Sequence, residues 1–307
     1  MRSRKAIIED LTSRYGRIPN ELDRIEIYHA RNDLKNEYGA PPDDPYEIIG
    51  QQKFFDAIAR ALAGEEWTPA LADSIRYRLF SYRLNYYWHY RLRRLSPPNP
   101  RPMRMMSWER MSETLACCVM LNQMKEAIYL AYLTFSAINL RYQLALSYNE
   151  EHRRAQAFIL RLFADWQGGM RHDWPSDLKS EPTYEGILAR WRDPESNQLA
   201  KLLKDACDRH VRQALNDTSN RFFDFPDESM MRTPVEILMV FRLRELIGLT
   251  NPTVKHPLLK SPFDKLPAHE PLPPPEPIMQ ATLSRLRSDW PDFDKATWLE
   301  SIMKTAA

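Results

Sequence analysis

Residues 107–148 form a long apolar stretch near the middle of this chain. Only three charged residues interrupt positions 115–146, and positions 127–140 carry none. A bilayer-spanning helix needs about 20 predominantly apolar residues, so this run is short for a membrane span and long for a strand. The pattern therefore predicts one or two helices that are apolar on nearly every face and buried at the centre of a helical domain.

Apolar residues recur at helical spacing along most of the remaining chain, and sustained period-2 alternation is absent. Four glycines follow such runs at the expected helix ends, namely Gly64, Gly168, Gly169 and Gly248. Asp44–Glu47 and Thr233–Glu236 predict capping boxes with proline at the first helical position. The predicted helices are 20–36, 45–63, 68–95, 150–167, 183–192, 194–215, 234–248 and 278–290, with a short one after them. We therefore predict an all-α, multi-helix bundle built on long antiparallel helices.

A proline-rich segment, residues 249–277, precedes the last helices. Its nine prolines exclude helix and favour an extended path across the surface. The apolar residues between the prolines indicate that the segment packs against the body along this path. We treat 1–307 as one helical domain, with 1–148 and 149–307 as possible halves.

Composition and charge narrow the classes of function. The net charge of +2 gives no global field that would favour nucleic acid or an acidic substrate. Three cysteines, two of them adjacent, imply no disulfide framework and fit a reducing compartment. Residues 1–17 lack the apolar core of a secretory signal. These features predict a cytoplasmic protein without a membrane span.

Two residue pairs have metal-ligand spacing, Glu26-x-x-His29 and Cys207-x-x-His210. A di-iron bundle needs a second such pair and two further glutamates, and a structural zinc site needs four ligands. The chain offers neither set, so we predict a surface ion pair at the first and a buried cysteine beside a satisfied histidine at the second. Phosphate-binding glycine loops and hydrolase motifs are also absent. We therefore predict no metal, no cofactor, no catalytic residue and no enzymatic activity.

The predicted helix 68–95 and the residues after it combine arginine with aromatic side chains. Between positions 74 and 108 there are eight arginines and no acidic residue. Single-stranded nucleic acid needs aromatic faces for base stacking and cations for phosphates, so this region is one possible binding element. The alternative is a helix packed on two sides, whose arginines pair with carboxylates elsewhere. The rest of the chain is net acidic, so such partners are available.

Two loops mix acidic and aromatic residues and are the candidate partner-binding surfaces, residues 217–228 and the turn at 172–174 with Asp177 after it. Tryptophan is enriched at interface hot spots, and exposed carboxylates suit a basic partner. Charge reversal at Asp224 and Asp227 is therefore predicted to weaken binding without unfolding the protein. The candidate residues are His172, Asp173, Trp174, Asp177, Asp217, Phe223, Asp224, Asp227 and Glu228.

Four sequence stretches resemble the helical immunity proteins that bacteria encode beside polymorphic or type VI secretion toxins, particularly those paired with nuclease effectors. In chain order they are HARNDLKNEYG, FFDAIARAL, SWERMSETLACCVMLNQMKEAIYLAYL and HPLLKSPFDKLP. The resemblance implies a cytoplasmic, non-enzymatic protein that binds one cognate toxin and occludes its active site. Immunity proteins against nucleases are often acidic overall, whereas this chain is slightly basic, so any mimicry of nucleic acid must come from a local patch.

Two other functions compete with this one. A single-stranded nucleic-acid binder would use residues 76–104, and its affinity would fall steeply with salt. A helical adaptor in a larger assembly would have several partners instead of one. The sequence leaves the oligomeric state open.

Overall fold

Helices are the only regular secondary structure in the part of the chain that the structure describes, as the sequence predicts. The computed structural model describes residues 8–9, 18–31, 40–95, 107–139, 153–168 and 181–306. Its elements are α2 (Ile18–Ala30), α3 (Asp43–Ala63), α4 (Thr68–Leu95), α5 (Trp108–Met120), α6 (Met124–Asn139), α7 (Arg154–Trp166), α8 (Pro182–Arg190), α9 (Asn197–Gln213), α10 (Val235–Leu246), the 3-10 turn η2 (Pro257–Leu259), α11 (Pro277–Asp289), α12 (Phe293–Thr297) and α13 (Leu299–Ala306).

The central apolar stretch folds into two helices, α5 and α6, which turn at residues 121–123. Asn122 makes this turn with a φ of 59°, a conformation that asparagine tolerates better than most residues. Every residue from 111 to 121 is buried, because α4, α6, α7 and α10 all pack against α5. None of the described helices is both long enough and apolar enough to cross a bilayer.

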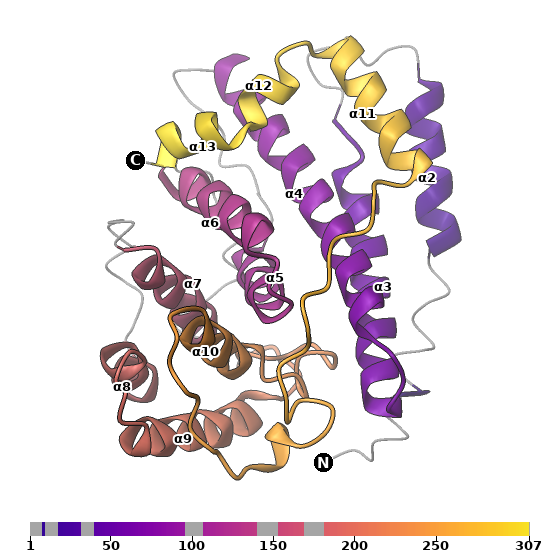
Figure 1. Cartoon of the computed structure of the whole chain (residues 1–307). Helices are drawn as coiled ribbons and strands as arrows, with labels where there is room; N and C mark the ends of the chain where they lie inside the picture. The colour runs from indigo at the N-terminus through magenta and orange to yellow at the C-terminus, as the bar shows by residue number, and fades with distance from the viewer. Residues whose placement is uncertain are drawn as a thin grey trace.

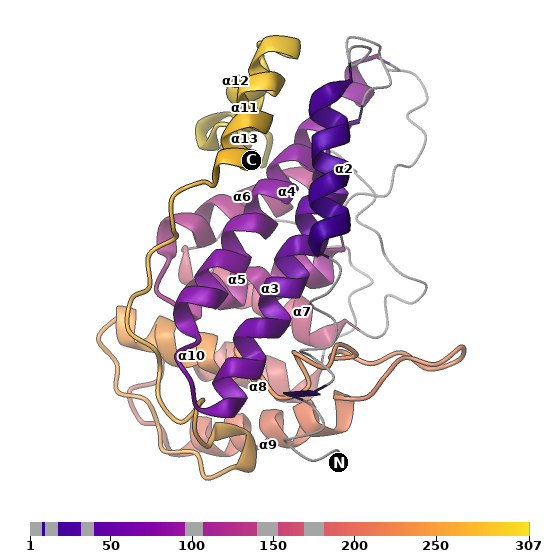
Figure 2. The same ribbon diagram turned by 90° about the vertical axis from the view of Figure 1, so that its right-hand side faces the viewer.

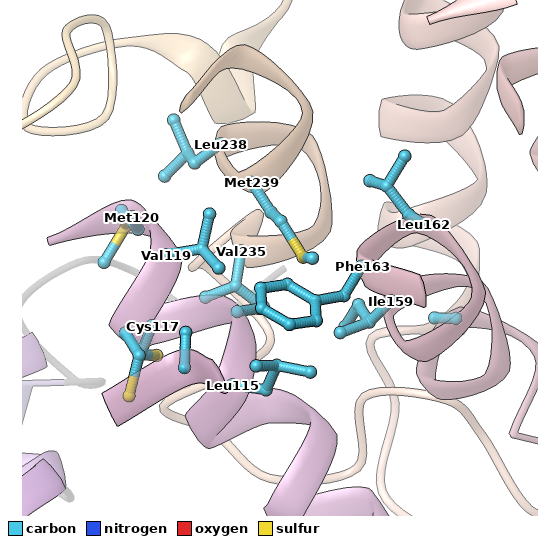
Figure 3. Packing of buried hydrophobic residues seen from close by; sticks show 14 of the residues in the cluster. Leu115, Cys117, Val119, Met120, Ile159, Leu162, Phe163, Val235, Leu238 and Met239 are labelled. Atoms are coloured by element: carbon cyan, nitrogen blue, oxygen red, sulfur yellow. The ribbon is translucent and has the colours of Figure 1, made fainter. Parts of the chain in front are cut away.

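The main hydrophobic core lies where α5, α7 and α10 meet. Figure 3 shows Val119, Phe163 and Met239 from these three helices pointing toward one another. The three cysteines are buried in the same core without disulfide bonds. Burial raises the pKa of the Cys117 thiol to about 12, so this thiol is a packing group rather than a nucleophile.

The antiparallel pair α3–α4 forms one side of the bundle (Figure 1). The two helices approach closely at Gly50, where an added Cβ would lie 2.8 Å from Arg78 Cγ and 3.2 Å from the Arg78 backbone nitrogen. Ser74 Oγ also donates a hydrogen bond to the Gly50 carbonyl (2.7 Å). Glycine at position 50 therefore makes room for the buried Arg78 side chain between the helices.

A second, smaller core lies on the other side of α3 and α4, where α2, α11 and α12 pack. Figures 1 and 2 show residues 249–276 crossing the bundle and the C-terminal helices lying at the end of the bundle where α2 lies. Tyrosine, phenylalanine and tryptophan make up much of this core. Its buried members are Ile25, Tyr28, Tyr46, Ile49, Tyr77, Phe80, Leu84, Tyr87, Met279, Leu286, Trp290 and Phe293.

The proline-rich segment runs between the two cores and forms hydrogen bonds with the α5–α6 turn. Apart from η2, residues 249–276 have irregular backbone. The Glu270 N–H donates to the Leu121 carbonyl (3.2 Å), and Gln123 Nε2 donates to the Glu270 carbonyl (2.7 Å). The segment is thereby attached to the α5–α6 turn.

Three of the four predicted glycine helix ends are present. Gly64, Gly168 and Gly248 follow α3, α7 and α10 with φ values of 83°, 86° and 78°, and Gly169 lies outside the described residues. Glycine reaches these left-handed conformations without a Cβ penalty.

The two predicted capping boxes are wrong. The Thr233 hydroxyl donates to the Ser229 carbonyl (2.7 Å), while Glu236 hydrogen-bonds to His210. At α3, Asp44 and Glu47 pair with arginines from α2 and α5. In both places the carboxylate that would complete the capping box binds a side chain of another helix instead.

A candidate interaction surface

Most of the arginine and aromatic side chains of α4 that the structure describes are buried or half-buried, whereas Arg94 is exposed. Tyr77, Tyr82, Tyr86 and Tyr87 are at most 2% exposed, and their hydroxyls bond to Glu276, Thr114, Ser136 and Asp292 respectively. The arginines find carboxylates on the C-terminal part of the chain. These pairs are Arg76 with Glu276, Arg83 with Asp294 and Arg94 with Asp292. For α4 the structure therefore supports the packed-helix interpretation, because buried rings cannot stack on bases. The rest of the candidate region, residues 96–104, lies outside the described residues.

The histidines with metal-ligand spacing are held by other contacts. His210 is fully buried, with Nδ1 2.8 Å from Glu236 Oε1 and Nε2 3.1 Å from the Met230 carbonyl. This is the satisfied core histidine that the sequence predicts. His29 Nε2 lies 2.7 Å from Thr282 Oγ1, and no ion pair joins it to Glu26 within the described residues. Across the same residues, no group of three or more His, Cys, Asp and Glu side chains could hold a metal ion.

Asp224 is an interior residue rather than part of an acidic surface. It is 0% exposed. Its two oxygens accept the backbone N–H groups of Arg154 (3.2 Å) and Ala155 (3.3 Å) at the start of α7, and Arg209 pairs with it at 2.5 Å. A carboxylate in this position accepts hydrogen bonds from the free N–H groups at the start of α7 and interacts favourably with the positive end of the helix dipole. Burial raises the pKa of Asp224, and Arg209 opposes that shift.

Three of the neighbouring candidate residues are also turned inward. Asp227 accepts hydrogen bonds from Gln51 Nε2 (2.8 Å) and from the Ser229 backbone N–H (2.9 Å). Phe223 and Glu228 are each 7% exposed. The prediction of one acidic surface at 217–228 is therefore wrong, because Asp224 and Glu228 are buried and the carboxylates of Asp224 and Asp227 hold the loop to the body. The other candidates, His172, Asp173, Trp174 and Asp177, lie outside the described residues.

The part of this region that faces solvent is a narrow loop, residues 215–222, which we call the projecting loop. Figure 2 shows it extending away from the body after α9, on the side opposite the proline-rich segment. Residues 215–221 are all exposed, and the Leu215 side chain is 51% exposed. Among the candidate residues, only Asp217 belongs to this exposed part.

Hydrogen bonds close the projecting loop at three levels. The Phe225 N–H donates to the Gln213 carbonyl (3.2 Å) at its base. The Phe223 N–H donates to Asp217 Oδ1 (2.8 Å) further out, and the Thr218 N–H donates to the Arg221 carbonyl (2.8 Å) near the tip. The Asp217 carboxylate thus stabilises the loop itself, and the loop leaves the body as a pre-formed element.

Three elements hold the base of the projecting loop. Besides the α7 amides, Gln156 Nε2 from α7 donates to the Asp224 carbonyl (2.6 Å), Arg209 comes from α9, and Gln51 comes from α3. The sequence predicts this region as a candidate, but Asp224 and Glu228 face the interior instead of the solvent. No local signal gave the correct face, because the burial of Phe223 and Phe225 on either side of Asp224 is known only from the structure.

The opposite side of the molecule carries a hollow of about 560 Å³ between α10 and residues 251–266 of the proline-rich segment. Phe241, Leu259 and Phe263 contribute apolar lining, while Glu245, Asp264 and Lys265 supply charges of both signs. The guanidinium of Arg242 at this hollow donates to the Met120 and Pro267 carbonyls and pairs with Glu245. The charges favour no particular ligand, so the projecting loop is the better candidate site.

No protein-family model matches this chain, and neither a curated protein nor a solved structure matches it significantly.

Proposed function

We propose that this chain is an immunity-type binding protein that neutralises one cognate toxin by inserting the projecting loop into the active-site cleft of that toxin. One observation carries the proposal: the loop is exposed at its tip and fixed at its base. A narrow convex element of this kind fits a concave partner, and enzyme active sites are concave.

The energetic advantage of the projecting loop lies in its pre-organisation. Binding a disordered segment costs conformational entropy, whereas a loop already closed by hydrogen bonds loses less on association. The buried Asp224 and Arg209 lie directly below it, so the tip is held relative to a rigid core. Leu215 adds apolar surface that a partner can bury.

The resemblance noted in the sequence supports the same class of function. Helical immunity proteins bind one toxin and occlude its active site, and a projecting loop provides a direct means of occlusion. The nucleic-acid alternative receives no comparable support, because the tyrosines of α4 are core residues.

The test uses the product of the reading frame next to this gene as the binding partner. Residues 216–222 are replaced by Gly-Ser-Gly, and affinity is measured by calorimetry. We expect the dissociation constant to rise by about 100-fold or more, because the central contacts of an interface carry most of its energy. Cells that express the toxin should lose protection in parallel.

A matched control replaces the exposed pair Glu65 and Glu66, in the turn between α3 and α4, with Gly-Ser. This variant should bind like the wild type, and both variants should retain the wild-type helical circular dichroism. Unchanged affinity in the projecting-loop variant would remove the loop from the interface and overturn the proposal.

A further inference from the structure

The charges on the projecting loop indicate what kind of cleft it fits. This inference rests on the proposed function and concerns the same loop. Sequence reasoning assigned the region an acidic surface suited to a basic partner. The structure removes two of the four carboxylates from the surface, because Asp224 is fully buried beside Arg209 and Glu228 is 7% exposed. Asp227 is half-buried and accepts hydrogen bonds from Gln51 and Ser229. Asp217 is exposed but accepts the Phe223 N–H.

Two arginines remain exposed at the loop. Arg221 lies near the tip and Arg212 lies on the last turn of α9 beside the base. Neither forms an ion pair with a carboxylate of the described residues, whereas many of the arginines elsewhere in this part of the chain do. An unpaired guanidinium in this position is available to a partner.

The Arg221 side chain is also partly oriented. Its guanidinium carbon lies over the Phe223 ring, 5.5 Å from the ring centroid, and the Arg221 carbonyl accepts the Thr218 N–H that closes the tip. Stacking on an aromatic face restricts the rotamers of a long side chain and leaves the N–H groups at its edge free to donate. Arginine held in this way is suited to bidentate binding of a carboxylate.

We infer that the projecting loop binds a protein cleft lined by aspartate and glutamate side chains, with Arg221 as its central contact. Leu215 and the small polar residues 218–220 add neutral surface beside this cation, and the exposed carboxylate of Asp217 is held by the Phe223 N–H. A cleft built to hold nucleic acid by lysines and arginines would repel it. The partner is therefore an enzyme whose reaction centre is acidic.

The test places a photo-activatable benzoylphenylalanine at Asn220 in the full-length protein and irradiates the cells that produce it. Cross-linked peptides are identified by mass spectrometry. The expected result is one dominant protein, cross-linked through a segment that contributes several aspartates or glutamates to a cleft. The same partner is then purified for affinity measurements.

Charge variants complete the experiment. Arg221→Glu should weaken binding by about 30-fold or more, as expected for an interfacial charge pair, while Arg221→Lys should lose less. The matched control is Lys201→Glu, an equal charge change on the exposed face of α9, about 16 Å along the helix from Arg212. It should change affinity by less than about threefold, because a distant exposed charge is screened.

The outcomes separate this inference from the proposed function. Cross-linking to a lysine- and arginine-rich cleft, or full binding by Arg221→Glu, overturns the acidic-cleft inference and leaves the loop as a binding element. Absence of any dominant cross-linked protein overturns both.

Discussion

Two buried charge clusters in this protein differ in how completely their polar atoms are bonded. The first lies below the projecting loop, where Asp224 uses both oxygens and Arg209 pairs with Asp224 and with Glu181 (3.0 Å). The second lies between α3, α4 and α5, around Arg78 and Glu113, which are 2% and 4% exposed.

The second cluster is incompletely bonded. Arg78 donates to Gln51 and Thr114, but its Nε has no partner, and neither has Glu113 Oε1, among the described residues. Burying a charge costs several kcal/mol unless partners replace the lost water. We therefore expect the first cluster to stabilise the protein and to hold the projecting loop. In the second cluster, neutralising Glu113 should leave stability unchanged or raise it.

The largest expected effect comes from breaking the first cluster. Asp224→Ala removes the carboxylate that caps α7 and leaves Arg209 buried with one partner fewer. We expect the free energy of unfolding to fall by about 3–5 kcal/mol, measured by urea denaturation. Asp224→Asn, which keeps part of the hydrogen bonding, should lose less. Equal losses in the two variants would show that the charge pair contributes little.

The same geometry corrects the expectation that charge reversal at Asp224 leaves the fold intact. A lysine at position 224 would place a cation beside Arg209 and against the N-terminal end of α7. Loss of binding by that variant would therefore report unfolding, so interface tests belong on Arg221 and Leu215.

A smaller effect follows from crowding the second cluster. Gly50→Ala places a methyl group 2.8 Å from Arg78 Cγ, in a helix pair that cannot separate without disturbing the core. We expect a loss of about 1–3 kcal/mol, seen as a lower melting temperature. The control is Gly186→Ala, whose methyl group would meet only the flexible end of Leu202. There the helix-forming preference of alanine offsets the contact, so stability should change little.

The charge state of Glu113 gives the second cluster a pH dependence. Burial raises the pKa of Glu113 from 4.5 to about 8, Arg78 and Arg110 lower it, and Asp227 raises it. The folded protein holds this proton more tightly than the unfolded chain does. The contribution of Glu113 to the free energy of unfolding is therefore greatest below pH 4.5. It decreases as the pH rises toward 8.

Glu113→Gln should therefore flatten the stability profile between pH 6 and pH 8.5. Above pH 8 the variant should be more stable than the wild type by about 1–2 kcal/mol, measured by chemical denaturation at each pH. Burial also raises the pKa of Asp43, to about 6. Asp43 therefore changes its charge mainly below this pH window. An unchanged slope in the variant would contradict the assignment to Glu113.

The smallest effect is expected at an exposed ion pair. Arg24 pairs with Asp44 at 2.8 Å, and their side chains are 47% and 63% exposed. Asp44→Asn should change the free energy of unfolding by less than about 1 kcal/mol, because water screens such pairs. A loss as large as that of Asp224→Ala would show that burial of an ion pair does not determine how much it stabilises the protein.

The helical fold could be read from the sequence because helices follow local rules. The period of apolar residues and the glycines after α3 and α10 depend only on neighbouring positions. The burial of the 111–121 stretch was equally predictable, since a helix that is apolar on every face must be covered on every side.

Whether a charged side chain faces solvent or the interior, and which partner it binds, could not be predicted from neighbouring positions. Arg76 pairs with Glu276, 200 positions away, and Asp227 bonds to Gln51, 176 positions away. Such pairs exist only after distant segments pack together: the residue before α11 against α4 in the first pair, and the loop between α9 and α10 against α3 in the second. A carboxylate beside phenylalanine, as at Asp224, is compatible with both a surface and an interior place until that packing is known.

The sequence by itself therefore determined the class of fold and the positions of most helices, because both depend on short-range periodicity. Only the tertiary structure decided that the tyrosines of α4 lie in the core, that Asp224 holds the base of the projecting loop, and that Arg221 faces solvent. Burial is a property of contacts between distant segments, and the free-energy cost of an unpaired buried charge selects which carboxylate meets which arginine.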